Sequence, residues 1–338
     1  YNRKRPCQNA CKIGAISMNE DGTVKIDNSK CISCGACVYQ CPFGALSDKS
    51  FILDAIKMLK NCERVYAIVA PAIVSQFTYA KPGQVITAIK ALGFCDVLEA
   101  ALGADMVAYS EASELAERGF LTSSCCPAFV SYIRKSFPEL QENISHNMSP
   151  MATIAKRIKE KDPEARTVFI GPCTAKKGEF QLPEVHKYVD CVLTFEELQA
   201  MFDSRELDVA GMEETVLNNA SGYGRIFAHC GGLAEAAAEA LKEQGIDFEL
   251  KPLSCNGIEE CKLALMKAAR GKLDANFVEG MACIGGCVNG AGCMTHNDRN
   301  RVKVDAHSQQ AHLKSITDSL LYAAEIDREL EEKAGDKV

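Results

Sequence analysis

Three cysteine-bearing segments have the residue types and the spacing of a metal-cluster site. They read TSSCCPAF (122–129), GPCTAKKGEF (171–180) and EGMACIGGC (279–287). Cys283 and Cys287 are one helical turn apart among glycines, a poor arrangement for a disulfide because bridge geometry is demanding. Each segment follows an apolar or strand-like stretch, so the three can meet at one end of the fold. Four thiolates drawn from them would hold one cubane cluster: Cys126, Cys173, Cys283 and Cys287.

A fourth cysteine motif lies near the N-terminus and predicts a separate cluster. The stretch CISCGACVYQCP has the C-x2-C-x2-C-x3-C-P spacing, formed by Cys31, Cys34, Cys37 and Cys41. In bacterial [4Fe–4S] modules the first three thiolates hold one cluster and the fourth binds a neighbouring cluster. Zinc is the weaker alternative, since zinc sites usually divide their ligands into two separated pairs.

The preceding stretch CQNACKIGAI matches the second half of a sister motif, with Cys7 and Cys11 in the third and fourth cysteine positions. By the same logic, Cys11 completes the first cluster. Cys7 and Cys41 would then serve a second cluster that needs two further ligands. Either a C-x2-C pair precedes Tyr1 or that cluster is incomplete; we expect a truncated module.

The composition argues against several classes of protein. The chain has 338 residues and a net charge of −7, which argues against nucleic-acid binding. No apolar stretch approaches the roughly 18 residues of a membrane span, and nothing resembles a secretory signal. The 18 cysteines are clustered rather than spread, which favours metal binding in a reducing compartment. We therefore expect a cytoplasmic protein that binds no membrane.

The elements that must position these motifs alternate between strand-like and helix-like stretches. This alternation predicts an α/β domain of two lobes, with sheets flanked by helices, after a small α+β N-terminal domain. Helical spacing runs through 95–119, and 224–232 has a strand pattern. We predict a ferredoxin-like 2[4Fe–4S] domain at 1–50, a catalytic domain at 51–305 and a C-terminal helix at 306–338.

Taken together, the three later segments resemble the TSCCP, PCxxKxxE and ExMACxxGCxxG motifs of [FeFe]-hydrogenases. The resemblance covers the whole chain, a ferredoxin-like module followed by a hydrogenase catalytic domain. It implies an H-cluster: a [4Fe–4S] cubane joined through one cysteine to a di-iron subcluster that carries CO, cyanide and azadithiolate. One or two further [4Fe–4S] clusters would occupy the N-terminal module.

The resemblance also implies roles for single residues. Cys126, Cys173, Cys283 and Cys287 match the cubane ligands, and Cys287 the bridge to the di-iron unit. Lys176 would donate to a cyanide ligand, with Glu179 beside it. Further residues match positions around the di-iron unit: Met281, Ala70, Pro71 and Ala72.

A proton route follows from the same resemblance. Cys125 precedes a ligand cysteine and matches the thiol that relays protons; a thiol pKa near ~8.5 suits exchange around neutrality. Glu111 and Glu114 in SEASE match two relay carboxylates, and Ser145 matches the serine between them. The alternative is ordinary surface carboxylates and a capping serine.

The implied reaction is 2H⁺ + 2e⁻ ⇌ H2, with a ferredoxin or similar redox partner and with maturation proteins that insert the di-iron unit. Two alternatives stay open. One is an H2-sensing or regulatory member with low turnover. The other is a non-catalytic Fe–S protein like the hydrogenase-like assembly factors, which lose the relay cysteine and bind no di-iron unit.

Several positions depart from the pattern of the best-known enzymes and resemble a divergent branch, often called group B. Gly171 stands in place of a methionine, and Met151 in place of a glutamine. The third motif ends in GAGCM rather than GGGQP. The roles of Cys293 and Cys230, extra cluster-proximal thiols or packing residues, are left open.

Overall fold

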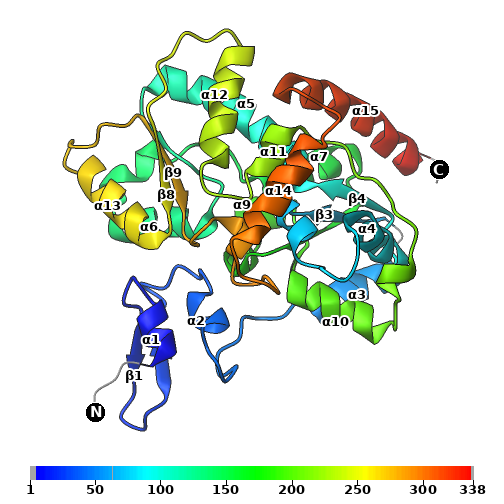
Figure 1. Ribbon diagram of the computed structural model, residues 1–338, viewed down its shortest axis with the longest axis horizontal. Helices are drawn as coiled ribbons and strands as arrows, with labels where there is room; N and C mark the ends of the chain where they lie inside the picture. The colour runs from blue at the N-terminus through cyan, green and yellow to red at the C-terminus, as the bar shows by residue number, and fades with distance from the viewer. Residues whose placement is uncertain (1–4, 63, 336–338) are drawn as a thin grey trace.

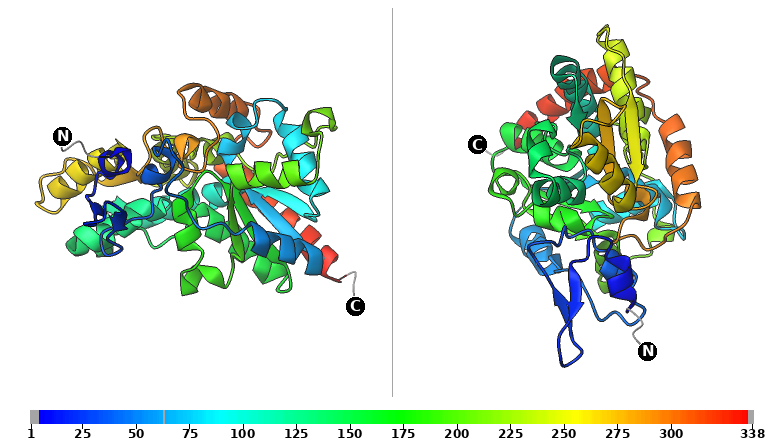
Figure 2. Two further views of the ribbon diagram at one scale, coloured as in Figure 1. Left: turned by 90° about the horizontal axis from the view of Figure 1, so that it is seen from below. Right: turned by 90° about the vertical axis from the view of Figure 1, so that its left-hand side faces the viewer.

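The computed structural model describes residues 5–62 and 64–335. The N-terminal module forms one end of the molecule, drawn in blue in Figures 1 and 2. Strands β1 (Ile16–Met18) and β2 (Val24–Ile26) pair antiparallel, with Ile16 opposite Ile26. Two short helices complete the module, α1 (Pro6–Ala10) and α2 (Ala36–Tyr39). Most of its length is loop, so cysteine loops rather than packed elements dominate it.

The larger lobe is built on a parallel four-stranded sheet in the order β4-β3-β6-β7. All five residues of β3 are buried, as expected for a parallel strand covered on both faces. Helix α7 (Pro150–Lys161) packs against β3 and β6, and α10 (Phe195–Ser204) against β6 and β7. The strands are β3 (Val65–Val69), β4 (Asp96–Glu99), β6 (Arg166–Gly171) and β7 (Cys191–Thr194).

The second lobe contains a parallel three-stranded sheet in the order β5-β9-β8. Helices α12 (Gly232–Glu243) and α13 (Ile258–Ala268) pack against β8 and β9, as Figure 1 shows. The strands are β5 (Leu121–Thr122), β8 (Pro252–Asn256) and β9 (Phe277–Met281).

Helix α5 (Ala100–Arg118) packs against α7, α11, α12 and α15, and thus joins the two lobes. A Cβ at Gly103 would overlap the carbonyl of Pro150, so glycine permits the close approach of α7. The other helices are α3 (Ile52–Asn61), α4 (Pro82–Ala91), α6 (Pro127–Ser136), α8 (Thr174–Glu179), α9 (Pro183–His186), α11 (Gly222–Ile226), α14 (Arg299–Gln309) and α15 (Ile316–Gly335). Short 3-10 turns are η1 (Pro71–Ser75), η2 (Pro138–Asn143), η3 (Val209–Gly211) and η4 (Cys287–Asn289).

The predicted fold class is confirmed, with sheets flanked by helices and a small N-terminal module. Two element predictions are wrong. The helical stretch 95–119 begins with the strand β4, because its apolar residues Val97 and Leu98 pair with β3. The predicted strand at 224–232 contains helix α11, since Ser221 caps it by accepting from the backbone of Tyr223 and Gly224.

The pattern also missed a buried ion pair that holds α11 to the main sheet. Arg225 is 1% exposed and its Nε and Nη2 donate to the Glu99 carboxylate, each at 2.8 Å. Such a bidentate pair is strongly directional. Its position at the end of β4 explains why 224–232 is not a strand.

At the C-terminus the predicted helix from 306 is divided in two. Helix α14 ends at Gln309, and α15 begins at Ile316 after a short loop. Residues 336–338 of the predicted helix lie outside the described residues. Among the described helices, none has the length and apolar content needed to span a bilayer.

Candidate metal-cluster site

The candidate site lies where the strands of both sheets end. Cys126 directly precedes α6 and Cys173 directly precedes α8, so each thiol begins a helix after a strand. Cys283 follows β9, and Cys287 opens the 3-10 turn η4. Carboxyl ends of parallel strands share one edge of a sheet, which is why segments far apart in sequence meet here.

The four thiols lie close enough to influence one another's ionisation. Burial and the neighbouring Cys126 thiol raise the pKa of Cys173 to about 11. Burial also raises the pKa values of Cys283 and Cys287 above the ordinary range. After burial, the largest causes of both upward pKa shifts are the neighbouring thiols Cys173 and Cys126. Four half-buried, free thiols that repel one another as thiolates fit a cationic iron–sulfur cluster, which would compensate their charge.

A single metal ion fits the described residues less well. They include no group of three His, Cys, Asp or Glu side chains close enough to hold one ion. In a cubane each cysteine binds a different iron atom, so its ligands stand further apart than those of one ion. The arrangement therefore suits a cluster rather than zinc.

Glycines let the third motif close onto the second. Gly292 N donates to the Pro172 carbonyl at 2.8 Å. A Cβ at Gly290 would overlap the same carbonyl, whereas glycine has none. The backbone of 290–292 is thereby fixed beside Cys173.

Lys176 and Glu179 form a buried ion pair beside the thiols. The Nζ of Lys176 lies 2.6 Å from Oε2 of Glu179 and donates to the Cys125 carbonyl at 3.4 Å. Burial lowers the pKa of Lys176, but the Glu179 carboxylate opposes this and the net shift is upward. The ammonium is therefore charged at neutral pH and placed to donate toward a ligand near Cys125.

Three of the residues predicted to lie around the di-iron unit, Ala70, Pro71 and Ala72, follow the end of β3. Ala70 is 6% and Ala72 0% exposed, and Pro71 opens the 3-10 turn η1. Met281 ends β9 and is 2% exposed. At Gly171 a Cβ would lie 2.5 Å from the Phe169 ring, which explains why the methionine of the resembling enzymes is absent here.

The predicted relay residues lie in one continuous region between the thiols and the surface. Burial raises the pKa of Cys125 well above its ordinary value, and the nearby Glu111 carboxylate is the second largest cause of this upward shift. Burial raises the pKa of Glu111 to about 8. Neither Glu111 oxygen has a hydrogen-bond partner among the described groups, although Ser145 is close enough to lower its pKa. A buried acid with no fixed partner suits the passage of a proton.

The outer carboxylate, Glu114, has several partners. Oε2 accepts from Ser145 Oγ at 3.1 Å and from Asn147 Nδ2 at 3.0 Å. Oε1 accepts from Arg118 Nη1 at 2.8 Å and lies 3.1 Å from His146 Nδ1. The Glu114 side chain is 13% exposed, so the region reaches solvent at this end.

The segments that follow Cys11 and Cys41 have the same local structure, which supports the relation between the two N-terminal half-motifs. The Cys11 sulfur accepts from Ala15 N at 3.1 Å, and the Cys41 sulfur from Ala45 N at 3.4 Å. Gly14 and Gly44 both adopt positive φ, at 70° and 58°. N–H donors to sulfur are typical of cluster thiolates, because they stabilise negative charge.

The thiols Cys11, Cys31, Cys34 and Cys37 form a second group. Burial raises the pKa of Cys37 to about 11, followed by contributions from Cys34, Cys31 and Cys11. Cys7 is buried within α1, and the structure shows no link between it and Cys41 among the described residues. Helices α1 and α2 pack against each other, and a second cluster at Cys7 and Cys41 stays a prediction.

A cavity of about 1000 Å³ is lined by the N-terminal thiols and by one thiol of the candidate site, Cys283. Cys34 and Cys283 both line it, and Cys34 is influenced by Cys126. Thr174, next to Cys173, donates from Oγ1 to the Ser33 carbonyl at 3.1 Å. This hydrogen bond connects the N-terminal loop directly to the segment that carries Cys173.

One buried carboxylate at the site, the glutamate that opens the third motif, was given no role in the sequence analysis. Glu279 is 0% exposed and accepts from Gly231 N at 2.9 Å and Ser254 Oγ at 2.9 Å. It contributes to the raised pKa values of Cys125 and Glu111. The available signal was a glutamate inside the otherwise apolar stretch FVEGM.

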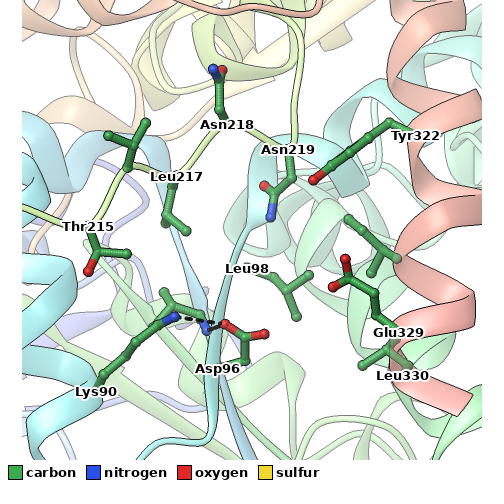
Figure 3. A pocket seen from close by; sticks show the side chains of 13 residues that line it. Lys90, Asp96, Leu98, Thr215, Leu217, Asn218, Asn219, Tyr322, Glu329 and Leu330 are labelled. Atoms are coloured by element: carbon green, nitrogen blue, oxygen red, sulfur yellow. Dashed lines mark hydrogen bonds and ion pairs between the residues drawn. The ribbon is translucent and has the colours of Figure 1, made fainter. Parts of the chain in front are cut away.

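A separate cavity of about 240 Å³ lies between β4, residues 215–219 and α15 (Figure 3). The ion pair of Lys90 with Asp96, at 3.1 Å, lines it. Its lining contains no cysteine and no predicted site residue, so we assign it no role in the candidate site.

Comparison with known families agrees with this arrangement. The profile of the iron only hydrogenase large subunit, C-terminal domain, matches residues 63–291, more than half of the chain. The chain belongs to the iron-only hydrogenase family. A 4Fe-4S binding domain matches residues 24–47. The resemblance read from the cysteine motifs is therefore confirmed at the level of a hydrogenase-like protein.

Among relatives, iron hydrogenase 1 of Clostridium pasteurianum is 31% identical over 339 residues, which cover 83% of this chain and 58% of that protein. The periplasmic [Fe] hydrogenase large subunit of Nitratidesulfovibrio vulgaris is 29% identical, over 80% of this chain and 86% of its own length. A probable cytosolic Fe-S cluster assembly factor of Brugia malayi is 22% identical over 80% of this chain and 72% of its own. The chain thus spans less than two thirds of the clostridial hydrogenase.

Solved hydrogenase structures share the fold. The structure of HydA(deltaEFG), described as revealing stepwise [FeFe]-hydrogenase H-cluster assembly, superposes with a TM-score of 0.67. The two are 21% identical, and the match covers 82% of this chain and 94% of that chain. At this identity the likeness shows the hydrogenase fold alone.

Proposed function

We propose that this protein catalyses the reversible reaction 2H⁺ + 2e⁻ ⇌ H2. One observation carries the proposal. Cys283 lines a cavity together with the N-terminal thiols, while Cys126 and Cys287 lie close to the Cys125 thiol, which in turn lies close to the buried Glu111 carboxyl. Hydrogen formation consumes electrons and protons at one place, and this arrangement offers a separate supply of each.

In this proposal Cys126, Cys173, Cys283 and Cys287 would hold an H-cluster, and Cys287 would also serve its di-iron part. The donor set fits, because the four free thiols lie close together and the pKa values of Cys173, Cys283 and Cys287 are raised, so their thiolates need a compensating positive charge. When bound, this cofactor would supply the redox chemistry of H2 and protons. The chain's own residues ligate, orient, exclude water and move protons.

Further residues support the di-iron part of that cofactor. The charged Lys176, fixed by Glu179, is placed to donate a charge-assisted hydrogen bond to a cyanide. Ala70, Pro71, Ala72 and Met281 would line its pocket. Since these side chains carry no ionisable group, they exclude water without competing for protons.

Protons would move between Cys125, Glu111, Ser145 and Glu114. Glu111, with its pKa raised to about 8, is largely protonated at neutral pH and can donate toward the Cys125 thiol. It can recover a proton from Glu114 through the Ser145 hydroxyl, which bonds Glu114 at 3.1 Å. Each donor is left deprotonated by its transfer and is restored when the next group outward gives it a proton.

Electrons would enter from a ferredoxin or a similar partner through a [4Fe–4S] cluster held by Cys11, Cys31, Cys34 and Cys37. The electrostatic influence of Cys126 on Cys34 supports this direction. We include maturation proteins for the di-iron unit and a cytoplasmic location in the proposal, the latter on the clustered free thiols.

A second candidate is a non-catalytic Fe–S protein, favoured by the likeness to the Brugia malayi assembly factor. The presence of Cys125, and the buried Glu111 beside it, favour catalysis.

H2 evolution from reduced viologen by protein matured with the di-iron unit separates the candidates. We expect sustained turnover that Cys125→Ala abolishes. A fully loaded protein with negligible turnover would favour the regulatory alternative. A protein that binds only [4Fe–4S] clusters after maturation would favour the assembly factor.

A further inference from the structure

His146 lies beside Glu114, the outer carboxylate of the proposed proton route, and has no role assigned in the reaction. The His146 side chain is 73% exposed, while that of Glu114 is 13% exposed. Its backbone is fixed, because His146 N donates to Glu114 and the preceding Ser145 N donates to the Thr122 carbonyl at 2.8 Å. The imidazole is therefore held at the surface with one edge toward Glu114.

The two ring nitrogens of His146 face different groups. Nδ1 lies 3.1 Å from Oε1 of Glu114, and Nε2 lies 3.5 Å from Nη1 of Arg118. Arg118 can only donate a proton in a hydrogen bond, so Nε2 is the acceptor. The neutral ring then carries its proton on Nδ1 and donates to Glu114. This tautomer follows from the contacts rather than from an observed hydrogen.

Glu114 itself is poorly placed to take protons from solvent. Both of its oxygens accept from neighbouring donors, and its side chain is largely covered. Arg118 is exposed beside it, but a guanidinium does not give up its proton in proteins. Arg118 is also held by Glu114 and by the carbonyl of Glu142. Of these groups, only the imidazole both reaches solvent and can take up a proton at one ring nitrogen while it gives one up at the other.

We propose that His146 is the proton-collecting residue of this protein: it takes protons from solvent or buffer acid and passes them to Glu114. The inference rests on the proposed function. In one transfer, Nε2 forms a bond to the incoming proton while the N–H bond at Nδ1 breaks. That proton goes to Glu114 Oε1, and the ring stays neutral with its proton on Nε2.

The ring then returns to its starting tautomer by proton exchange with solvent, which its exposure permits. No electrons are transferred in any of these steps. For H2 oxidation the same steps run outward, from Glu114 to the ring and then to buffer base.

The test compares His146→Gln with the matched control His312→Gln, a substitution of another exposed histidine. We expect His146→Gln to slow viologen-driven H2 evolution about fivefold at pH 8. This loss is smaller than the roughly 10²-fold of a fully positioned acid–base group, because buffer acids partly replace the ring. At pH 6, where solvent protons are more abundant, the loss should shrink to less than about twofold. Added imidazole should restore the rate at pH 8, and His312→Gln should match wild type.

A second readout does not depend on turnover. In full-length protein labelled with 15N-histidine, we expect the Nδ1–H tautomer at His146 and its loss in Glu114→Ala. An Nε2–H tautomer in wild type would overturn the inference. So would a His146→Gln profile equal to wild type, given normal wild-type turnover. A wild type without turnover would instead overturn the proposed function, and this inference with it.

Discussion

The two approaches to the catalytic thiols differ in how tightly they are built. On the electron side, the N-terminal loop and the catalytic segments face each other across a cavity of about 1000 Å³, with one hydrogen bond from Thr174 to Ser33 beside the thiols. On the proton side, Glu111 is 1% exposed and Ser145 bonds Glu114 at 3.1 Å. One side is an open, thiol-lined space and the other a narrow run of acids.

This difference follows from what each side would carry. A proton moves between heavy atoms that lie within hydrogen-bond reach, about 2.6–3.2 Å. An electron needs no atom-to-atom contact, so cluster-bearing loops can be held by peripheral contacts. Such contacts are present: Lys177 bridges Asp48 at 2.6 Å and Glu197 at 2.7 Å, while Tyr39 stacks on His296. Small displacements should therefore harm the proton side more than the electron side.

The largest effect should come from the thiols that both sides share. Cys173→Ser should remove a cubane ligand and abolish H2 turnover, because a hydroxyl is a poor replacement for a soft thiolate. Iron analysis should show the loss of one [4Fe–4S] cluster. Cys62→Ser, at a partly buried thiol outside the site, is the control and should retain both H2 turnover and the full iron content. Full iron and normal turnover in Cys173→Ser would refute the ligand assignment.

The next largest effect should come from the proton side. Glu111→Gln keeps the size of the buried side chain but cannot cycle a proton, so H2 evolution should fall about 10²- to 10³-fold. Cluster content should be unchanged. Glu117→Gln lies on the same helix in an exposed position and should behave as wild type. Turnover within about twofold of wild type in Glu111→Gln would place the proton route elsewhere.

A smaller and donor-dependent effect should follow a change on the electron side. A Cβ at Gly35, where φ is 72°, would overlap Thr174 and lie 2.5 Å from the Ala291 Cβ. Gly35→Ala should cost about 1–3 kcal/mol of overpacking and shift the Cys34 loop. Turnover driven by a ferredoxin should fall, while a small viologen that reaches the catalytic thiols directly should still support it.

Gly44→Ala is the matched control, because Gly44 also has positive φ but nothing within 4 Å of the added Cβ. Gly44→Ala therefore has the same kind of backbone strain as Gly35→Ala but no steric overlap. Equal losses in the two variants would assign the effect to strain alone. Equal losses with ferredoxin and viologen in Gly35→Ala would show that the electron side is not separable from the catalytic thiols.

The last effect concerns stability rather than turnover and runs opposite to activity. Burial raises the pKa of Glu111 to about 8, so its contribution is complete below the unfolded value near ~4.3 and is lost as pH rises through 8. Glutamine does not titrate. Glu111→Gln should therefore match wild type near pH 5 and be more stable at pH 9, by on the order of 3 kcal/mol. Thermal unfolding at both pH values measures this, and a lower melting temperature than wild type at pH 9 would contradict it.

Much of the fold was predictable from local patterns. The strand-like runs at 65–69, 166–171 and 277–281 are parallel strands, and the alternation with helices gave the correct class. The prediction failed where tertiary contacts override local pattern. Residues 96–99 form a strand through pairing with β3, and 222–226 form a helix that places Arg225 on Glu99.

The motifs in the sequence led to the residues of the candidate site but not to their environment. Spacing identified the cysteines, and the resemblance nominated Glu111, Glu114 and Ser145. The electrostatic influence of Glu279 on Glu111 depends on three-dimensional packing that no spacing encodes. The contact of His146 with Glu114 likewise arises because the segment after η2 lies beside α5.

Infrared spectroscopy of the matured protein tests the central claim most directly. The account predicts absorption bands of iron-bound CO and cyanide, which Cys287→Ser should remove by breaking the proposed bridge. Cys62→Ser should retain them. Matured wild-type protein with its full [4Fe–4S] iron but none of these bands would contradict the proposed function.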